Sequence, residues 1–441
     1  MGYSGEINFD GLIGPTHNYA GLSQGNLASQ KHLNQTSNPQ AAALQGLDKM
    51  RIIMEQGIPQ GFFLPHERPN LITLRGLGFG GTDEEVISRV AKQDPALLKN
   101  VYSASSMWAA NAATFSPSID SYDQTIHITP ANLNTMFHRS IEPEFTKMQL
   151  QLMFGSIAKI HDPVSNISGY GDEGAANHLR VTAQHLKPGF QIFVYGNSAF
   201  ESNQGVIARQ AQEISQAVAA QHQLDPDLTL FLKQNNLAIE SGSFHNDIVS
   251  LANEEVFIFH QEAFADRVEL ERVLHHLKEH VKGFHPIEIL SADISLDNLV
   301  SSYLLNSQLI TLENNQMMML LPEEVQNHSN CIRWLDEIKS SSPIKLIEFV
   351  DIRQSMMNGG GPACLRFKTV MNDEEFSKVN QKFLLNPKKL MDLRSLVSKH
   401  YRDNLSPEDL MDIQLMEESY TFLDELTQLL DLGSIYHFQK T

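Results

Sequence analysis

The chain has 441 residues, of which 41% are hydrophobic and 19% charged, a composition that excludes a disordered protein. It carries 33 Lys and Arg against 52 Asp and Glu, a net charge of −19, so we expect no binding to nucleic acid or to anionic membranes. The first ten residues contain two acids and no apolar run, and there are only two cysteines, which together predict a cytoplasmic protein that acts on a small molecule.

A glycine-rich segment is the first motif in the chain. Residues 76–81 have the spacing of a dinucleotide-binding loop, follow the apolar residues 71–74 and precede a helix start at Thr82. No following strand with an acidic residue for a ribose is evident. We therefore interpret this segment as a loop between two helices.

A unit of two strands and a helix is clearest in the second half of the chain. The predicted strands are residues 248–251 and 256–259 in one copy, and 309–312 and 317–321 in the next. The first copy continues into a helix near Glu262, and the second into a helix that opens at Pro322.

Looser copies of this unit precede the two clear ones. Their predicted strands are residues 112–115, 125–129, 179–182 and 190–195, with helices near Leu133 and after Asn203, and the strand 365–370 belongs to a fifth copy. The five copies start at residues 111, 177, 245, 306 and 364, separated by 66, 68, 61 and 58 residues. A near-regular period indicates repeated supersecondary units, although an ordinary α/β chain would give similar spacings. Arranged around an axis, the units would bring these starts to its centre and place their helices outside.

Cys364 is the strongest candidate nucleophile. It ends the segment 358–364, which contains three consecutive glycines, and it precedes a predicted strand. Glycine lacks a Cβ, so a substrate can approach the backbone closely and the loop can present the thiol. The alternative is a small buried hydrophobic residue after a turn, which is our interpretation of Cys331 on its helical pattern.

Thiol chemistry needs a base and a group that orients the base. His245 precedes a strand at the place equivalent to Cys364, and Asp247, two residues on, would point to the same side in an extended chain. Glu173, in a turn bracketed by glycines, is the candidate partner of the imidazole. Taken singly, such a histidine is more often a surface or core residue, and such an acidic run is more often a solvated turn or a helix cap.

A second group of histidines lies on a predicted helix. His275, His276 and His280 fall within residues 268–281, which are rich in acids and bases. We see no convincing carboxylate or thiolate partner for a metal there, so we interpret the segment as a solvated helix face.

With Glu173, His245 and Cys364 in this order, the sequence resembles the N-succinylarginine dihydrolase family of the guanidino-group-modifying superfamily. The resemblance runs from end to end and rests on residues 8–12, 19–23, 65–69, 171–178, 244–247 and 358–364. It implies an α/β fold, a five-bladed β/α propeller of ββαβ modules around a central active site. It also implies one catalytic domain over residues 1–441 and a homodimer.

The resemblance implies a hydrolase of arginine catabolism, in the arginine succinyltransferase pathway, with no metal or organic cofactor. The reaction converts N2-succinyl-L-arginine and two waters to N2-succinyl-L-ornithine, two ammonia and carbon dioxide through a covalent thiouronium. Cys364 would be the nucleophile, His245 the acid and base, and Glu173 its partner. The implied substrate-binding residues are Ala20, Gly21, Leu22, Ser23, Gln24, Gly25, Asn26, Leu27, Ala28, Ser29, Asn111, His138, Arg139, Arg209, Asp247 and Asn358.

The residue types agree with this chemistry. An imidazolium at His245 would lower the pKa of the thiol and then protonate the departing ammonia. Asp247 would pair with the guanidinium, while Arg139 and Arg209 would receive the carboxylates of the substrate. Related deiminases have an aspartate where Asn111 stands, and we hypothesise that the neutral amide lets a ureido intermediate stay for a second attack.

Three other functions remain open at this stage. An arginine deiminase would stop after one hydrolysis, and an amidinotransferase would use the same scaffold. A guanidino-binding protein without chemistry would need the charged clamp but neither thiol nor imidazole. A papain-like amidase fits less well, because its cysteine usually precedes its histidine in the sequence.

Overall fold

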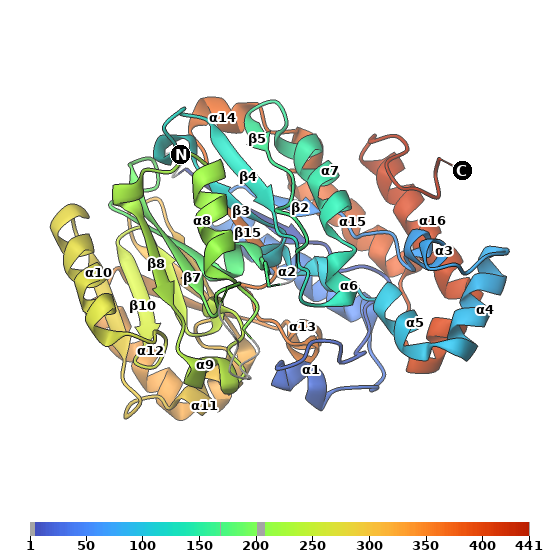
Figure 1. Ribbon diagram of the computed structural model, residues 1–441, viewed down its shortest axis with the longest axis horizontal. Coiled ribbons are helices and arrows are strands. Elements are labelled where there is room, and N and C mark those ends of the chain that lie inside the picture. Colours follow the sequence, from blue (N-terminus) through green and yellow to red (C-terminus); the bar gives the residue numbers. More distant parts are fainter. Residues whose placement is uncertain (1–4, 168, 201–207, 441) are drawn as a thin grey trace.

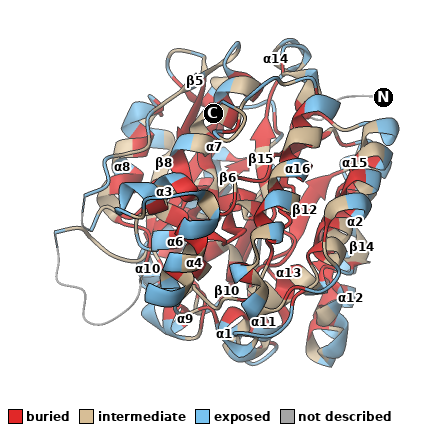
Figure 2. Cartoon of the chain, turned by 90° about the vertical axis from the view of Figure 1, so that its right-hand side faces the viewer, coloured by how far each residue is buried: buried red, intermediate tan, exposed pale blue. Residues whose placement is uncertain are grey.

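The computed structural model describes residues 5–167, 169–200 and 208–440. Strands lie in the interior and most helices lie on the outside (Figure 1). Burial follows the same division, since the strands are largely buried and the outer helices present exposed faces (Figure 2). This arrangement is expected when each sheet is apolar and needs a helix to cover it.

Five three-stranded sheets of one topology form the interior of the described chain. Their strands, in spatial order, are β15 (Arg366–Val370), β1 (Glu6–Gly11) and β2 (Gln60–Phe63); β3 (Ala113–Ser116), β4 (Ile126–Pro130) and β5 (Ala158–Ile160); β6 (His178–Thr182), β7 (Gly189–Tyr195) and β8 (Thr229–Lys233); β9 (Ser250–Asn253), β10 (Val256–His260) and β11 (His285–Ile289); β12 (Gln308–Thr311), β13 (Met317–Pro322) and β14 (Ile344–Val350). In every sheet the central strand pairs antiparallel with the first strand and parallel with the third.

A helix connects the two parallel strands of each sheet, as a parallel pair requires. These helices are α2 (Pro39–Glu55), α7 (Pro143–Phe154), α8 (Gln212–Gln221), α10 (Arg267–His280) and α12 (Ser329–Ser341). Capping residues define where several of them begin: Asn38 accepts a hydrogen bond from the Ala41 amide before α2, and Asp266 caps α10 in the same way.

The remaining helices surround this framework. They are α1 (Leu27–Lys31), α3 (Leu71–Gly76), α4 (Asp83–Gln93), α5 (Pro95–Val101), α6 (Phe137–Ser140), α9 (Asn236–Glu240), α11 (Leu296–Ser302), α13 (Arg353–Asn358), α14 (Asp373–Ser377), α15 (Pro387–His400) and α16 (Ile413–Leu429). Helices α3, α4, α5 and α16 share one apolar cluster at the right of Figure 1. Short 3-10 turns, η2 (Ala109–Asn111), η4 (Gly174–Asn177) and η6 (Asn246–Ile248), lead into the first strands of three of the sheets.

The predicted repeat agrees with the structure in the first two strands of four units and in β15, but it lacked the third strand of each sheet, and it agrees less well in its helices. Residue Pro322 ends β13 and is followed by a 3-10 turn, so the predicted helix begins later, as α12. Helix α10 begins at Arg267 rather than near Glu262, and the helix expected near Leu133 is the short α6 followed by α7. The start expected after Asn203 lies outside the described residues, and α8 follows at Gln212.

The fifth unit differs from the other four in its connectivity. Strand β15, next to Cys364, pairs with β1 at the other end of the chain, and β1 in turn pairs with β2. Sequence reading assigned the fifth start correctly but did not foresee that the first strands of the chain complete it. The aromatic rings of Phe9 and Phe367 lie in one buried cluster across this junction, so packing joins the two ends.

Hydrogen bonds join the starts of the five units into a closed series. The donors and acceptors are Ala110 N to Cys364 O (3.1 Å), Asn111 Nδ2 to Glu173 O (2.7 Å), Asn246 N to Asn177 Oδ1 (2.9 Å), Asn306 Nδ2 to Asp247 O (3.4 Å) and Gly361 N to Asn306 Oδ1 (2.9 Å). Side chains of buried asparagines make four of these five links, because an amide side chain offers both a donor and an acceptor, and the link between Ala110 and Cys364 joins two backbone groups. The five unit starts are therefore linked to one another.

Candidate active site

Cys364 lies at the entry to β15 after a backbone that only glycine permits. Gly359 has φ of +106°, and a Cβ there would lie 2.1 Å from the amide nitrogen of Asn26. A Cβ on Gly361 would lie 2.7 Å from Oδ1 of Asn306. The loop is therefore packed against its neighbours, which fixes the position of the thiol that follows.

The thiol contacts a carboxylate rather than an imidazole. The Sγ atom of Cys364 lies 3.7 Å from Oδ2 of Asp247. The other carboxylate oxygen, Oδ1, is buried and has no hydrogen-bond partner. The prediction that Asp247 lies at the site is consistent with this contact, but its reason was wrong, because residues 246–248 form a 3-10 turn and not an extended chain.

His245 belongs to a separate group around the carboxylate of Glu173. Its Nε2 lies 2.8 Å from Oε2 of Glu173, and Arg139 donates to the same oxygen from Nη1 at 2.5 Å. Oε1 of Glu173 accepts from the hydroxyl of Thr135 at 2.9 Å, so both oxygens of this fully buried carboxylate are satisfied. Glu173 therefore contacts the imidazole, and its role as the partner of a catalytic His245 stays a prediction.

Burial and charge shift the pKa values of the thiol and its neighbour upward. The pKa of Cys364 lies well above its ordinary value because the thiol is buried and because Asp247 is close. Burial also raises the pKa of Asp247 to about 7, against the opposing effect of its hydrogen bonds with Cys364 and Asn306. Without substrate, the thiol is therefore protonated at neutral pH.

The pKa values of Glu173 and His245 are instead shifted downward. Burial raises the pKa of Glu173, but Arg139 and His245 together outweigh it and hold the pKa well below the ordinary value. Burial lowers the pKa of His245 to about 4, only partly opposed by Glu173, so the imidazole is neutral at pH 7. The expected imidazolium beside the thiol is not the state of this substrate-free structure.

Part of the predicted substrate-binding set lines one small cavity. A cavity of about 20 Å³ is lined by Ala20, Gly21, Leu22, Ser23, Ser29, His138 and Asn358, together with Trp108 and three other residues. Asn26 closes the loop onto the thiol segment by donating to the carbonyl of Gly359 at 2.8 Å. The loop of residues 20–29 therefore covers the site.

Other members of the predicted set lie around this cavity or face away from it. Arg209 stacks 4.0 Å from the ring of Phe244 and donates to the carbonyl of Gln24 at 2.6 Å. Asn111 contacts the backbone of Glu173, and Gly25 has φ of +84° at the turn of the loop. Leu27 and Ala28 instead line a separate cavity of about 630 Å³.

Two arginines retain buried donors without partners. These are Nε and Nη2 of Arg139 and Nε of Arg209. A guanidinium with unsatisfied buried N–H groups is suited to receive a carboxylate. His138 contributes no charge beside them, because burial and the neighbouring arginines lower its pKa to about 3.

Sequence reasoning missed two residues of the site. Asn306 was identified as a unit start, yet the structure shows that it holds both Gly361 and the backbone of Asp247. Thr135, which donates to Glu173, gave no signal in the sequence. Asn306 could have been found from its position, because the unit starts at Asn111, His245 and Cys364 each carry a predicted site residue.

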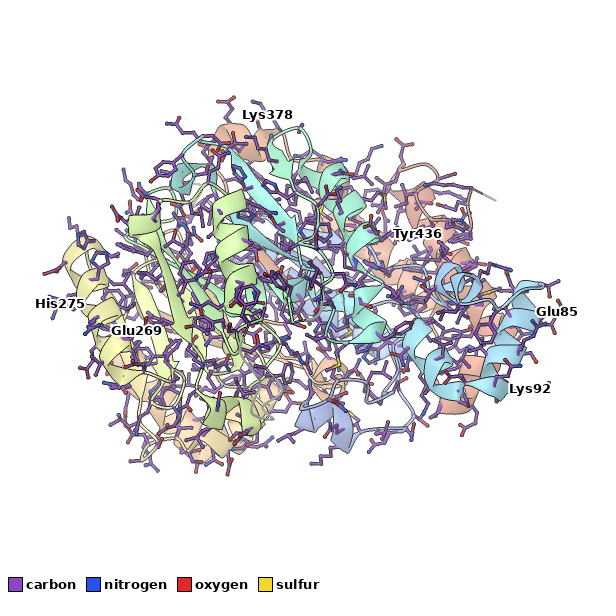
Figure 3. All side chains as sticks on the ribbon, viewed as in Figure 1. Glu85, Lys92, Glu269, His275, Lys378 and Tyr436 are labelled. Carbon is purple, nitrogen blue, oxygen red and sulfur yellow. The ribbon has the colours of Figure 1, made fainter. Side chains whose placement is uncertain are left out.

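The other predicted motifs lie away from this site. Residues 76–81 lie between α3 and α4, as interpreted, and Thr82 and Glu85 form a capping box at the start of α4. Cys331 is buried in α12, as expected. His275 projects from α10 at the left edge of the molecule (Figure 3).

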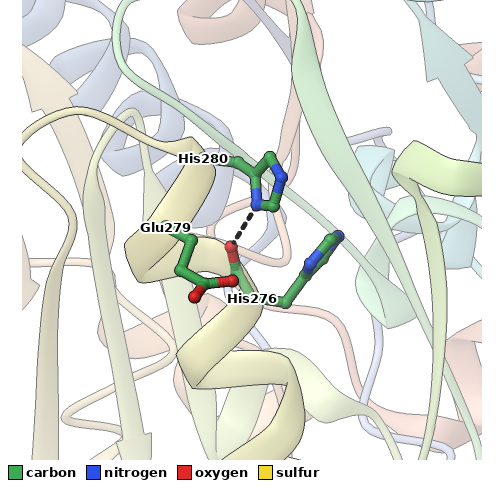
Figure 4. Close-up of side chains that lie close together, drawn as sticks. All are labelled: His276, Glu279 and His280. Carbon is green, nitrogen blue, oxygen red and sulfur yellow. Dashed lines mark hydrogen bonds between the residues drawn. The ribbon is translucent and has the colours of Figure 1, made fainter.

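The histidines of α10 do have an acidic neighbour. His276, Glu279 and His280 each offer one ligand atom, and these atoms lie within 4.8 Å of one another, which corrects the expectation that no carboxylate partner exists (Figure 4). The Nδ1 atom of His280 is already hydrogen-bonded to the carbonyl of His276 at 2.8 Å. Glu279 and His280 are exposed, in agreement with a solvated helix face.

No helix in the described part of the chain combines the length and the apolar character needed to cross a membrane.

Comparisons with known proteins agree on one family. Residues 3–439 match the family model described as succinylarginine dihydrolase. The chain is 46% identical to the N-succinylarginine dihydrolase of Idiomarina loihiensis and 47% identical to that of Shewanella sediminis, each over 99% of both chains.

Solved structures share the fold at low sequence identity. The product-bound N-terminal domain of ArgZ, a cyanobacterial arginine dihydrolase, matches with a TM-score of 0.52 and 12% identity, over 83% of this chain and 98% of that one. AgrE in complex with ornithine and NAD+ matches with a TM-score of 0.52 and 14% identity, over 84% of this chain and 40% of that one.

Proposed function

Because the chain belongs to the succinylarginine dihydrolase family, we propose that it hydrolyses N2-succinyl-L-arginine to N2-succinyl-L-ornithine, two ammonia and carbon dioxide, consuming two waters. The observation that carries this proposal is the identity of about 46% over nearly the whole length of relatives named for that activity. The buried thiol, carboxylates and imidazole described above supply groups suited to the chemistry.

Substrate binding activates the nucleophile in this proposal. The cationic guanidinium pairs with Asp247, whose Oδ1 has no partner in the protein, and its charge then lies near the thiol that contacts Oδ2. A cation beside a buried thiol favours the thiolate and so lowers its pKa. The neutral imidazole of His245 is then available to take the proton.

The first hydrolysis proceeds through a covalent adduct on Cys364. The thiolate forms a bond to the guanidinium carbon, and one C–N bond breaks as His245 returns its proton to the departing ammonia. Water then attacks the thiouronium carbon, His245 accepts a proton from that water, and the C–S bond breaks to give the ureido compound. Glu173 keeps the imidazole oriented throughout.

The second hydrolysis repeats the attack on the ureido carbon. A second ammonia leaves, water releases the remaining carbamate from sulfur, and loss of carbon dioxide frees the amine of succinylornithine. We assign to Asn111 the role of a neutral neighbour that tolerates the ureido group. Its amide nitrogen donates to the backbone of Glu173, which leaves its carbonyl oxygen to contact the substrate.

Arg139 and Arg209 are proposed to recognise the carboxylates that distinguish this substrate from arginine. Their unpartnered N–H groups are buried, so a ligand that leaves them unpaired would bind poorly. The loop of residues 20–29 would then close over the bound molecule through Gln24 and Asn26.

The larger assembly is also part of the proposal. The five sheets of one topology, and the hydrogen bonds that link their starts, support five blades of a β/α propeller within a single catalytic domain. From the resemblance of the sequence we also propose a homodimer in the cytoplasm that acts without a cofactor and binds no nucleic acid or membrane. Sedimentation of the purified protein tests the dimer.

The deciding experiment supplies succinylarginine and arginine to the purified protein and counts the products. Two ammonia and one carbon dioxide per succinylarginine, with little reaction on arginine, supports the proposal. One ammonia and a stable ureido product would identify a deiminase instead. Binding of succinylarginine without turnover would identify a guanidino-binding protein.

A further inference from the structure

A chamber lined by both charged and apolar side chains lies next to Asp247, and its lining includes no described residue of the loop 20–29. It is a cavity of about 100 Å³ whose lining includes Asp247 and Ala363, the latter next to the nucleophile. Three alanines, Ala110, Ala175 and Ala363, line it beside Asn111, Glu173 and Cys364. Small side chains therefore stand where the chamber adjoins the reactive residues.

First strands of several sheets form the wall of the chamber. Alternate residues of β15, Arg366, Lys368 and Val370, face it, as do Ser250 and Ala252 of β9. Four residues of a strand span roughly 13 Å, so the chamber leads well away from the thiol. Its far end is lined by charged side chains that include Lys368 and Glu254.

Unsatisfied polar atoms indicate what occupies the chamber. Oδ1 of Asp247 and Nη1 of Arg366 belong to lining residues, are buried, and have no hydrogen-bond partner in the protein. Buried polar groups of this kind are normally satisfied by ordered water, and one water needs roughly 10–15 Å³ of such a cavity. The chamber is therefore large enough for several water molecules.

The proposed reaction creates a need for a second path. Two waters must enter and two ammonia molecules must leave while the succinyl intermediate stays bound beneath the loop. The cavity under that loop measures only about 20 Å³. A separate path for small molecules, lined by other residues than this cavity, would let the loop remain closed through both hydrolyses.

We propose that this chamber is a conduit that delivers hydrolytic water to the thiouronium and removes ammonia. The inference rests on the proposed function and adds no bond-making step to it. Water and ammonia are of similar size and both form hydrogen bonds, so one polar conduit can serve both. Succinylornithine is too large for it and leaves on the side of the loop.

The test obstructs the chamber without touching the reactive residues. Ala252→Leu places three more carbons in it, whereas the matched control Ala252→Ser keeps it small and polar. We expect roughly a tenfold or greater loss of kcat for Ala252→Leu with KM within about twofold, and accumulation of the Cys364 adduct in acid-quenched enzyme. Wild-type kcat and adduct levels in a folded Ala252→Leu protein would overturn the proposal.

A second measurement does not depend on the variant folding. A high-resolution crystal structure of the wild-type protein should show ordered water between Oδ1 of Asp247 and Nη1 of Arg366, and a dry chamber would overturn the proposal. Failure of the function itself looks different, because the wild-type protein would then neither turn over succinylarginine nor form an adduct.

Discussion

The candidate site has two halves, one around Glu173 and one around Asp247, and the two carboxylates differ in the partners that the protein gives them. On one side Glu173 is surrounded by Arg139, His245 and Thr135, and both of its oxygens are satisfied. On the other side Asp247 contacts Cys364 with one oxygen and leaves the other unpaired in the interior. The same chemical group is stabilised as an anion in the first half and destabilised in the second.

The contrast indicates which half of the site is complete only when the substrate is bound. A satisfied carboxylate orients the imidazole before any ligand arrives, which is preorganisation. An unsatisfied carboxylate beside a protonated thiol lacks a cation, and the guanidinium of the substrate supplies it. The binding site is therefore incomplete without the molecule on which it acts.

Removal of the nucleophile should have the largest effect. Cys364→Ser should reduce kcat by roughly 10⁴-fold or more, because a serine hydroxyl at this position is a far weaker nucleophile than a thiolate. Binding of succinylarginine, measured by calorimetry, should persist. The matched control is Cys331→Ser in α12, which should keep wild-type activity; equal losses in both variants would refute the assignment.

Asp247→Asn should lower the activity of the enzyme and raise the stability of the folded protein. We expect kcat/KM to fall by about 10³-fold, because the guanidinium loses its counter-charge. The folded pKa of Asp247, about 7, lies above the ordinary value of 3.8, so its ionisation opposes folding as the pH rises from about 4 to 7. The variant should therefore be more stable than wild type by on the order of 4 kcal/mol at pH 8.

Denaturant unfolding at two pH values checks this sign. The advantage of Asp247→Asn should shrink as the pH is lowered from 8 toward 5, because wild-type Asp247 is then protonated too. A variant that is less stable than wild type at pH 8 would show that the protein stabilises the Asp247 anion after all.

Glu173→Gln also replaces a carboxylate by an amide, here in the half of the site around Glu173. Unlike Asp247→Asn, it should lower the stability of the folded protein. It leaves Arg139 as a buried charge without its partner, which typically costs about 3–5 kcal/mol. The low folded pKa of Glu173 means that its contribution is fully present at pH 7 and is lost as the pH falls below the ordinary value of 4.5. Activity should fall by about 10²-fold as the imidazole loses its orientation.

Urea midpoints at pH 7 measure this difference directly. Equal shifts for Glu173→Gln and Asp247→Asn would remove the distinction between the two halves.

The pH dependence of wild-type turnover sharpens the comparison further. Because kcat/KM reports the free enzyme, it should fall about tenfold per pH unit below an apparent pKa of about 7, where Asp247 becomes protonated. In the complex, the bound cation lowers the pKa of this carboxyl, so the acid limb of kcat should lie at lower pH. Coincident limbs for kcat and kcat/KM would contradict the role of the substrate as counter-ion.

Asn111→Asp should give the smallest change in rate and a change in product. Asn111 donates to the backbone of Glu173, and an aspartate would lose that donor and place a second negative charge near the substrate. We expect ammonia per substrate to fall from two toward one, with release of the ureido compound. Two ammonia and no ureido product from this variant would refute the role of Asn111.

The first two strands of four units and β15 were predictable from the sequence, whereas β1, β2, β5, β8, β11 and β14 were not predicted. Apolar alternation marked the strand pairs, and Asn306 and Cys364 each stood at the start of one. The helix starts were less predictable, because 3-10 turns such as residues 323–327 intervene and carry the same acidic residues as a first helical turn. Pairing of β15 with β1 is set by long-range packing that periodicity does not report.

Electrostatics was the least predictable property of the site. The residue types suggested an imidazolium that activates the thiol, but burial makes His245 neutral and keeps Cys364 protonated. Burial depends on what covers a residue, and here the covering segments come from distant parts of the chain, such as Asn26 over Gly359. Residue identity alone could not give the sign of these shifts.

The covalent adduct on Cys364 is the most direct test of the account. The wild-type protein is mixed with succinylarginine, quenched in acid within milliseconds and digested, and the peptide that contains Cys364 is weighed by mass spectrometry. We predict that this peptide gains the mass of succinylarginine less ammonia, and that the peptide with Cys331 remains unmodified. Turnover without any adduct on Cys364, or an adduct on another residue, would contradict the central claim.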